Sequence, residues 1–182
     1  MYKIAIMGTH GVGKSTLSYL IAAYYKSKGK NVDLIQERIR FSPFPYNENM
    51  TESTALWAYH AQIERELESE AKGFDLAVCD RSAIDCFFYA RYWKKNTAFI
   101  KRLWSVAIDE WMPRYDLVIY IRPDIELITD GIRSEDLMFQ KGIDALIKPY
   151  IDMRTEEDCY TKTILSSDIF NGKLDIEELL HA

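Results

Sequence analysis

The sequence has few cysteines and no long apolar run. Its three cysteines, Cys79, Cys86 and Cys159, form an odd number without C-x-x-C spacing, which argues against a disulfide framework and against a cysteine metal site. A few cysteines without a pairing pattern are typical of proteins from a reducing compartment, so we expect a cytoplasmic protein. The sequence offers no stretch of eighteen apolar residues to span a membrane. The apolar run at residues 4–7 is too short for a signal peptide.

The sequence also has no excess of basic over acidic residues. The 23 lysines and arginines are outnumbered by 28 aspartates and glutamates, and the formal net charge is −5. Because broad binding to nucleic acid needs a basic face, this balance argues against that class of function. Internal repeats and low-complexity tracts are missing as well. A length of 182 residues with 48% hydrophobic residues predicts a single domain over residues 1–182.

Short apolar runs alternate with stretches of helical character along the chain. This alternation is typical of βαβ units and predicts a parallel sheet. We expect strands at residues 2–7, 32–36, 75–79, 116–121 and 163–166. We expect helices at residues 15–28, at 49–72 behind a capping box at Asn49 and Glu52, at 81–95, at 97–112 and at a further stretch ending near 152. In the second of these helices, the charged stretch 64–70 is expected to form a solvated face.

A phosphate-binding motif lies between the first expected strand and the first expected helix. The segment Gly8-Thr9-His10-Gly11-Val12-Gly13-Lys14-Ser15 matches G-x-x-x-x-G-K-[ST]. Its glycines let the backbone aim N–H groups at phosphate oxygens, and the helix N-terminus adds positive potential. Lys14 is expected to reach the β- and γ-phosphates, and the Ser15 hydroxyl to bind Mg²⁺. The sequence therefore predicts a site for ATP and Mg²⁺ with the cofactor-binding residues Gly8, Gly11, Val12, Gly13, Lys14, Ser15 and Thr16.

An acidic and a basic residue follow the third expected strand. Asp80 ends this apolar run and Arg81 comes directly after it. Ligands of open α/β sheets bind at the carboxyl ends of the strands. A carboxylate there can hold the water shell of Mg²⁺, and an arginine can neutralise a transferred phosphate. An ion pair at the strand end or a helix cap is the alternative interpretation.

With Asp80-Arg81-Ser82 the chain resembles the P-loop kinases of nucleosides and nucleotides, in the branch of thymidylate kinase and deoxynucleoside kinase. Those kinases carry D-R-[YFH] or E-R-S at this place. Gln36-Glu37-Arg38 follows the second strand, where the branch places a glutamate near the acceptor. Residues 116–122, DLVIYIR, resemble its fourth strand, and residues 132–136, IRSED, lie where it carries an arginine-bearing lid. The likeness covers roughly residues 1–150.

The resemblance implies both a fold and a quaternary structure. It implies a three-layer α/β fold of the P-loop NTPase type, with a parallel five-stranded sheet in the order 2-3-1-4-5 flanked by helices. It places a lid segment at about residues 131–137. Dimerisation through the helices at 81–112 is common in this branch, so a homodimer is an open expectation.

The resemblance also implies roles for individual residues. Lys14, Arg81 and Arg133 would surround the transferred phosphoryl group, while Ser15 and Asp80 would hold the metal. Glu37 would face the acceptor, as a general base toward a hydroxyl, as a ligand of a sugar hydroxyl, or only as a positioning group if the acceptor is already a monophosphate. On the expected helix at 49–72, an aromatic side chain can stack on a base and Gln62 can pair with its edge. The catalytic set is Lys14, Glu37, Asp80, Arg81 and Arg133, and the substrate set is Glu37, Arg38, Trp57, Gln62 and Arg81.

Several functions remain open at this point. The expected one is transfer of the γ-phosphate of ATP to a nucleoside or a (deoxy)nucleoside monophosphate. A kinase that acts on a hydroxyl of a nucleic acid, such as a hydroxymethylated base in phage DNA, is the alternative, although the acidic charge does not favour it. A GTPase switch is less expected because the tetrad N-K-x-D is missing, and an ATPase module because Asp80 is not followed by a second carboxylate.

Overall fold

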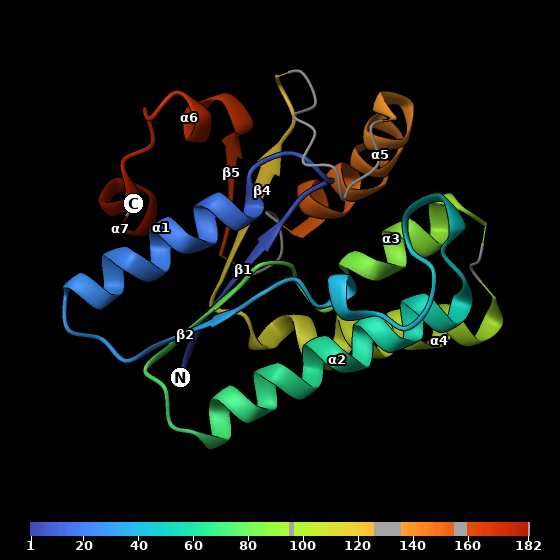
Figure 1. Ribbon diagram of the computed structural model, residues 1–182, viewed down its shortest axis with the longest axis horizontal. Helices are drawn as coiled ribbons and strands as arrows, with labels where there is room; N and C mark the ends of the chain where they lie inside the picture. Colours follow the sequence, from blue (N-terminus) through green and yellow to red (C-terminus); the bar gives the residue numbers. More distant parts are fainter. Residues whose placement is uncertain (95–96, 126–135, 155–159, 182) are drawn as a thin grey trace.

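The computed structural model describes residues 1–94, 97–125, 136–154 and 160–181. Within them, five strands form one parallel sheet in the order β2-β3-β1-β4-β5 (Figure 1). This confirms the expected fold class and strand order. The central strands are buried almost throughout, as is usual for a parallel sheet covered on both faces. The strands are β1 (Tyr2–Met7), β2 (Val32–Ile35), β3 (Leu76–Cys79), β4 (Leu117–Arg122) and β5 (Thr161–Leu165).

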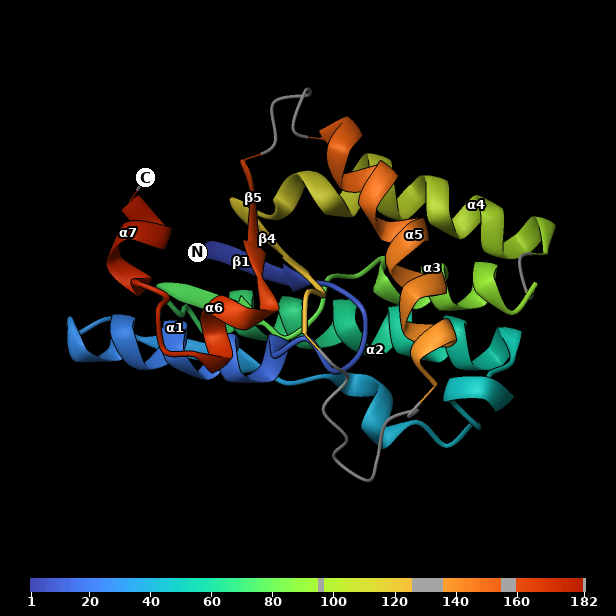
Figure 2. The same ribbon diagram turned by 90° about the horizontal axis from the view of Figure 1, so that it is seen from above.

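Helices cover both faces of the sheet and complete three layers (Figures 1 and 2). Successive side chains of a strand point to opposite faces, and β1 follows this rule. Ile4 and Ile6 join one core cluster, whereas Ala5 and Met7 join the other. The first cluster packs under α1 (Lys14–Ser27), α6 (Ser166–Phe170) and α7 (Ile176–His181). The second packs under α2 (Glu52–Ala71), α3 (Asp85–Tyr92), α4 (Ala98–Val106) and α5 (Leu137–Arg154).

Some element boundaries differ from the sequence-based expectation. The capping box of α2 is formed by Thr51 and Thr54, two residues after Asn49 and Glu52, because the hydroxyl of each threonine accepts a hydrogen bond from the backbone N–H of the other. The expected helix at 97–112 is α4 followed by a π-helical turn, η3 (Ala107–Trp111). Between β2 and α2 the chain forms two 3₁₀ turns, η1 (Arg38–Phe41) and η2 (Asn47–Asn49).

The expectation of a solvated face at 64–70 is wrong for two residues, Glu66 and Ser69, which are both buried. Glu66 lies on the inner side of α2 and has no exposed surface. It remains buried because charged and polar side chains from distant parts of the chain supply its hydrogen-bond donors. Among the described helices, none combines the length and the apolar character needed to cross a membrane.

Candidate active site

The phosphate-binding loop connects β1 to α1 and depends on its glycines. Gly8, Gly11 and Gly13 all have positive φ angles, of 147°, 76° and 95°. A Cβ atom at Gly8 would also lie 2.8 Å from the carbonyl oxygen of Ile121 on β4. All three positions therefore favour glycine for their backbone conformation, and Gly8 also for lack of space. Helix α1 begins at Lys14, so its N-terminus points into the loop.

Contacts from two other parts of the chain hold this loop. The Thr9 hydroxyl donates to the carbonyl of Gln140 on α5 at 3.1 Å, and the Gln140 amide donates to the carbonyl of His10 at 2.8 Å. On the opposite side, the Ser166 hydroxyl donates to the carbonyl of Val12 at 2.9 Å. The Lys14 ammonium donates to the carbonyl of Thr9 at 2.6 Å and is buried, whereas Thr16 is exposed on α1. These contacts give the loop a defined shape.

The residues expected to bind metal lie next to each other. The Ser15 hydroxyl donates a 2.5 Å hydrogen bond to Oδ2 of Asp80. Asp80 is buried, and its Oδ1 has no hydrogen-bond partner in the part of the chain that the structure describes. A buried carboxylate oxygen normally needs a partner. A hydroxyl and a carboxylate beside a phosphate-binding loop fit Mg²⁺, which takes oxygen ligands and retains several waters.

Arg81 adopts a strained backbone conformation directly after Asp80. Its φ angle is 118°, a region that costs a residue with a Cβ atom of order 1–3 kcal/mol. Its Nε donates to Oε1 of Glu37, and its Nη1 donates to Oδ1 of Asp85 at 3.4 Å. The guanidinium also lies 5.1 Å from the centroid of the Tyr89 ring. Strain of this kind persists where surrounding contacts impose it, and it is concentrated at functional sites.

The charges around Arg81 are coupled. Burial disfavours its charged form, but Glu37 and other neighbours nevertheless hold the pKa of Arg81 above its usual value. Burial raises the pKa of Asp85, and the attraction of Arg81 opposes that rise. The Asp85 carboxylate also accepts hydrogen bonds at 2.9 Å and 2.5 Å from the backbone N–H and hydroxyl of Ser82. Arg81 is therefore a permanent cation fixed by two carboxylates.

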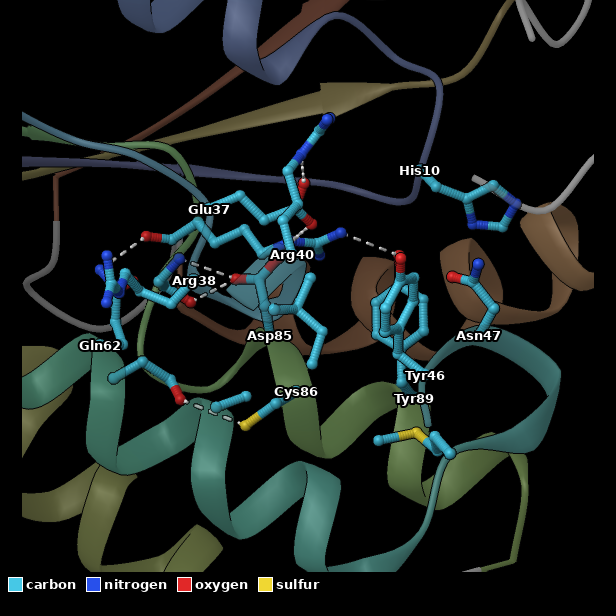
Figure 3. A pocket seen from close by; sticks show the side chains of 16 residues that line it. His10, Glu37, Arg38, Arg40, Tyr46, Asn47, Gln62, Asp85, Cys86 and Tyr89 are labelled. Carbon is cyan, nitrogen blue, oxygen red and sulfur yellow. Dashed lines mark hydrogen bonds and ion pairs between the residues drawn. The ribbon is translucent and has the colours of Figure 1, made fainter. Parts of the chain in front are cut away.

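A pocket opens beside these residues, between η1, α2 and α3 (Figure 3). Three arginines, Arg38, Arg40 and Arg81, and two carboxylates, Glu37 and Asp85, line it. A second hollow contains Ser15 and Asp80 and shares Glu37 and Arg40 with the first. The metal side and the pocket therefore adjoin at Glu37 and Arg40.

The structure brings together most of the residues expected to contact the acceptor. Glu37, Arg38, Gln62 and Arg81 all line the pocket. Within the described chain, the lining residues of α2 are Ala58 and Gln62, one turn apart, whereas Trp57 lies off this face and is half-buried. Arg133 lies outside the described residues. Of the expected lid at 131–137, only positions 136 and 137 are described.

The sequence did not identify Ser82, Asp85 or Tyr89 as site residues. All three line the pocket. Ser82 and Asp85 have the S-x-x-D spacing of a local hydrogen-bonding box, and Asp85 lies one helical turn after Arg81. These two spacings were signals that could have identified the pair. The role of Tyr89 could not be separated from core packing, because its neighbours Phe87 and Phe88 are buried.

Comparisons with known proteins agree with the fold. A probable thymidylate kinase of Saccharolobus solfataricus is 24% identical over 173 residues, which cover 86% of this chain and 85% of that protein. The structure of a deoxyadenosine kinase from M. mycoides with bound dATP superposes with a TM-score of 0.67 at 19% identity, over 99% of this chain and 97% of that one. A thymidylate kinase from Ehrlichia chaffeensis superposes with a TM-score of 0.66 at 18% identity, over 99% and 98% of the two chains. The chain is thus distantly similar to nucleoside and nucleotide kinases.

The match to a protein family covers most of the chain. Residues 3–155 match the family model described as an AAA domain. This range contains the phosphate-binding loop, the Ser15–Asp80 contact and the pocket around Arg81. With its P-loop, its parallel sheet and this matched range, the chain belongs to that AAA domain family of nucleotide-binding proteins.

Proposed function

We propose that the protein transfers the γ-phosphate of ATP, with Mg²⁺, to a small nucleotide acceptor: a (deoxy)nucleoside monophosphate or a nucleoside. The observation that carries this proposal is the shared wall between the two hollows. Glu37 and Arg40 line both the side of Ser15 and Asp80 and the pocket of Arg81. Phosphoryl transfer depends mainly on positioning and on positive charge around the moving group. A pocket that adjoins the phosphate-binding loop supports transfer to a second molecule.

The donor half uses the loop between β1 and α1. The backbone N–H groups of the loop and the Lys14 ammonium would bind the β- and γ-phosphates. Ser15 and Asp80 would hold Mg²⁺, which neutralises phosphate charge when bound. Arg81 would stabilise the transferred phosphoryl group from the acceptor side, and Arg133, outside the described residues, would join it.

The charges of the pocket favour a monophosphate acceptor within this class. Both carboxylate oxygens of Glu37 accept hydrogen bonds from guanidinium groups, Oε1 from Arg81 and Oε2 from Arg40 at 3.2 Å. A carboxylate held in this way suits positioning better than abstraction of a proton. Arg38 adds a third guanidinium, and its buried Nε has no hydrogen-bond partner within the described ranges. Such a group suits a phosphate oxygen.

The names of the relatives support the wider class of acceptor, a nucleoside or a nucleoside monophosphate. One curated relative is named as a probable thymidylate kinase. A second structure of the M. mycoides deoxyadenosine kinase, with a TM-score of 0.66 at 19% identity, carries dCMP and a flexible dCDP as products. Gln62 reaches the same pocket from α2, where its amide would meet the edge of a base.

Incubation with labelled ATP, Mg²⁺ and an acceptor panel tests the proposal. The panel contains the common nucleosides, their monophosphates, and oligonucleotides with and without hydroxymethylated bases. We expect label to move to one or a few monophosphates, and Lys14→Ala to abolish this transfer. Release of phosphate without a labelled acceptor would refute the kinase function. If only an oligonucleotide becomes labelled, the acceptor is a nucleic acid and the proposed small acceptor is wrong.

A further inference from the structure

Glu66 on α2 forms the centre of a buried polar cluster beneath the turn of Arg81. It has no exposed surface. Its Oε1 accepts hydrogen bonds from the Gln62 amide at 2.9 Å and from the Tyr115 hydroxyl at 2.6 Å. Its Oε2 accepts from the Trp111 indole at 2.9 Å and from the Lys3 ammonium at 3.4 Å. A buried carboxylate needs such partners to remain in the interior.

The two partners of Oε1 also bind the backbone of the Arg81 turn. The Gln62 amide donates to the carbonyl oxygen of Arg81 at 3.4 Å. The Tyr115 hydroxyl accepts a hydrogen bond from the backbone N–H of Ala83 at 2.9 Å. Burial and the charge of Glu66 raise the pKa of Tyr115, so this residue remains a phenol that donates to Glu66 and accepts from Ala83. The turn is thus held on both sides of Ser82.

The two partners of Oε2 serve other parts of the fold. Lys3 belongs to β1 and also forms an ion pair with Glu70 at 2.7 Å. Trp111 ends the π-helical turn after α4. Neither contact touches residues 81–83. One oxygen of Glu66 therefore faces the turn, and the other joins α2 to β1 and η3.

We propose that Glu66, acting through Gln62 and Tyr115, is a positioning residue that keeps Arg81 in its strained conformation and aims its guanidinium at the transferred phosphoryl group. This role rests on the proposed kinase function. The Arg81 backbone has a φ of 118°, so neighbouring contacts must hold it. The hydrogen bonds to the Arg81 carbonyl and the Ala83 N–H hold the backbone that directly follows this angle.

Two matched variants test the proposal. Tyr115→Phe and Trp111→Phe each remove one hydrogen bond to Glu66, but only Tyr115→Phe also removes the acceptor of the Ala83 N–H. With the best acceptor of the panel, we expect Tyr115→Phe to lower kcat about tenfold or more with little change in the KM for ATP, and Trp111→Phe to change kcat less than about twofold. In an Arg81→Ala background, Tyr115→Phe should lower kcat no further, because the two residues act as one unit.

A spectroscopic measurement separates this proposal from the proposed function. The side-chain Nε–H of Arg81 donates to Glu37, so it should give a resolved and slowly exchanging NMR signal. We expect Tyr115→Phe to shift this signal and speed its exchange, and Trp111→Phe to leave it unchanged. Glu66→Gln, of nearly equal volume, is the second variant if Tyr115→Phe does not fold, with the same expected changes.

The outcomes are distinct. If the wild type labels no acceptor, the proposed function fails, while the NMR signal still tests the positioning of Arg81. If Tyr115→Phe and Trp111→Phe give equal changes in kcat and in the Arg81 signal, the positioning role is refuted. Further loss of kcat from Tyr115→Phe in the Arg81→Ala background would also refute it.

Discussion

The guanidinium of Arg81 donates a hydrogen bond from Nε to Oε1 of Glu37 and so connects the turn after β3 to the second residue after β2. The two strands are neighbours in the sheet, with Ile35 paired to Cys79. Because both strands end at the same edge, residues 44 positions apart meet in one buried ion pair. This pair forms the boundary between the metal side and the pocket.

Replacement of Glu37 tests what the carboxylate does. Glu37→Gln keeps the size of the side chain but removes the charge between Arg81 and Arg40. With a monophosphate acceptor, we expect kcat to fall about tenfold, because the guanidinium is less well oriented while no base is lost. Steady-state kinetics with the acceptor identified by the panel provide the measurement. A loss of about a thousandfold or more would instead identify Glu37 as a general base and a hydroxyl as the acceptor.

Replacement of Arg81 separates its charge from its backbone strain. Arg81→Ala and Arg81→Gly both remove the guanidinium, so each should lower kcat by about 10²-fold. Glycine adopts a φ of 118° without the steric cost of a Cβ atom. We therefore expect Arg81→Gly to be more stable than Arg81→Ala by about 1 kcal/mol in urea unfolding. Equal stability of the two variants would contradict the strained backbone, and a kcat near that of the wild type would contradict the role of the guanidinium.

We expect the Mg²⁺ concentration that the reaction needs to depend on the carboxylate of Asp80. Asp80→Asn keeps an acceptor for the Ser15 hydroxyl but removes the negative charge. We expect the Mg²⁺ concentration that gives half-maximal transfer to rise about 10- to 100-fold, as for other residues that support a bound metal. Asp109→Asn, at an exposed carboxylate of η3, is the matched control and should leave the Mg²⁺ midpoint unchanged. Equal midpoints for Asp80→Asn and the control would remove Asp80 from the metal site.

The contact between Asp124 and Ser167 makes stability depend on pH. Hydrogen bonds from the Ser167 hydroxyl and backbone N–H, the latter at 2.8 Å, lower the pKa of Asp124 below its ordinary 3.8. A carboxylate with a lowered pKa stabilises the fold above the pKa of the unfolded chain, and this contribution is lost as the pH falls through the folded value. We expect the difference in stability between wild type and Asp124→Asn to be nearly constant from pH 7 to about pH 5 and to shrink only as the pH falls below 3.8. A difference in urea midpoint that persists unchanged well below pH 3.8 would contradict the assignment.

The sequence predicted the parts of the fold that depend on local patterns. The buried parallel strands produce nearly continuous apolar runs, so β1, β3 and β4 were predicted close to their observed bounds. The phosphate-binding loop was predicted because its glycines have fixed spacing. The start of α2 was predicted two residues early, because Asn49 and Glu52 have the same spacing as Thr51 and Thr54.

The pocket was harder to predict because it depends on long-range packing. Glu66 belongs to a charged stretch that a helix can expose, and only the contacts with Lys3, Trp111 and Tyr115 bury it. The strained φ of Arg81 has no signature in the residue type. The phase of α2, which presents Gln62 rather than Trp57 to the pocket, is set by packing against α3 and η1.

The contacts that hold the phosphate-binding loop have a consequence for the thermodynamics of ligand binding. Gln140 from α5, Ser166 from α6 and the loop's own Lys14 all bind its carbonyl groups. A flexible loop would lose conformational entropy on binding, and this loss would weaken affinity. Here that entropy is lost during folding, so it is not lost again when a triphosphate replaces the contact between Lys14 and Thr9. The affinity of the loop for phosphate is therefore not weakened by the ordering of a chain segment.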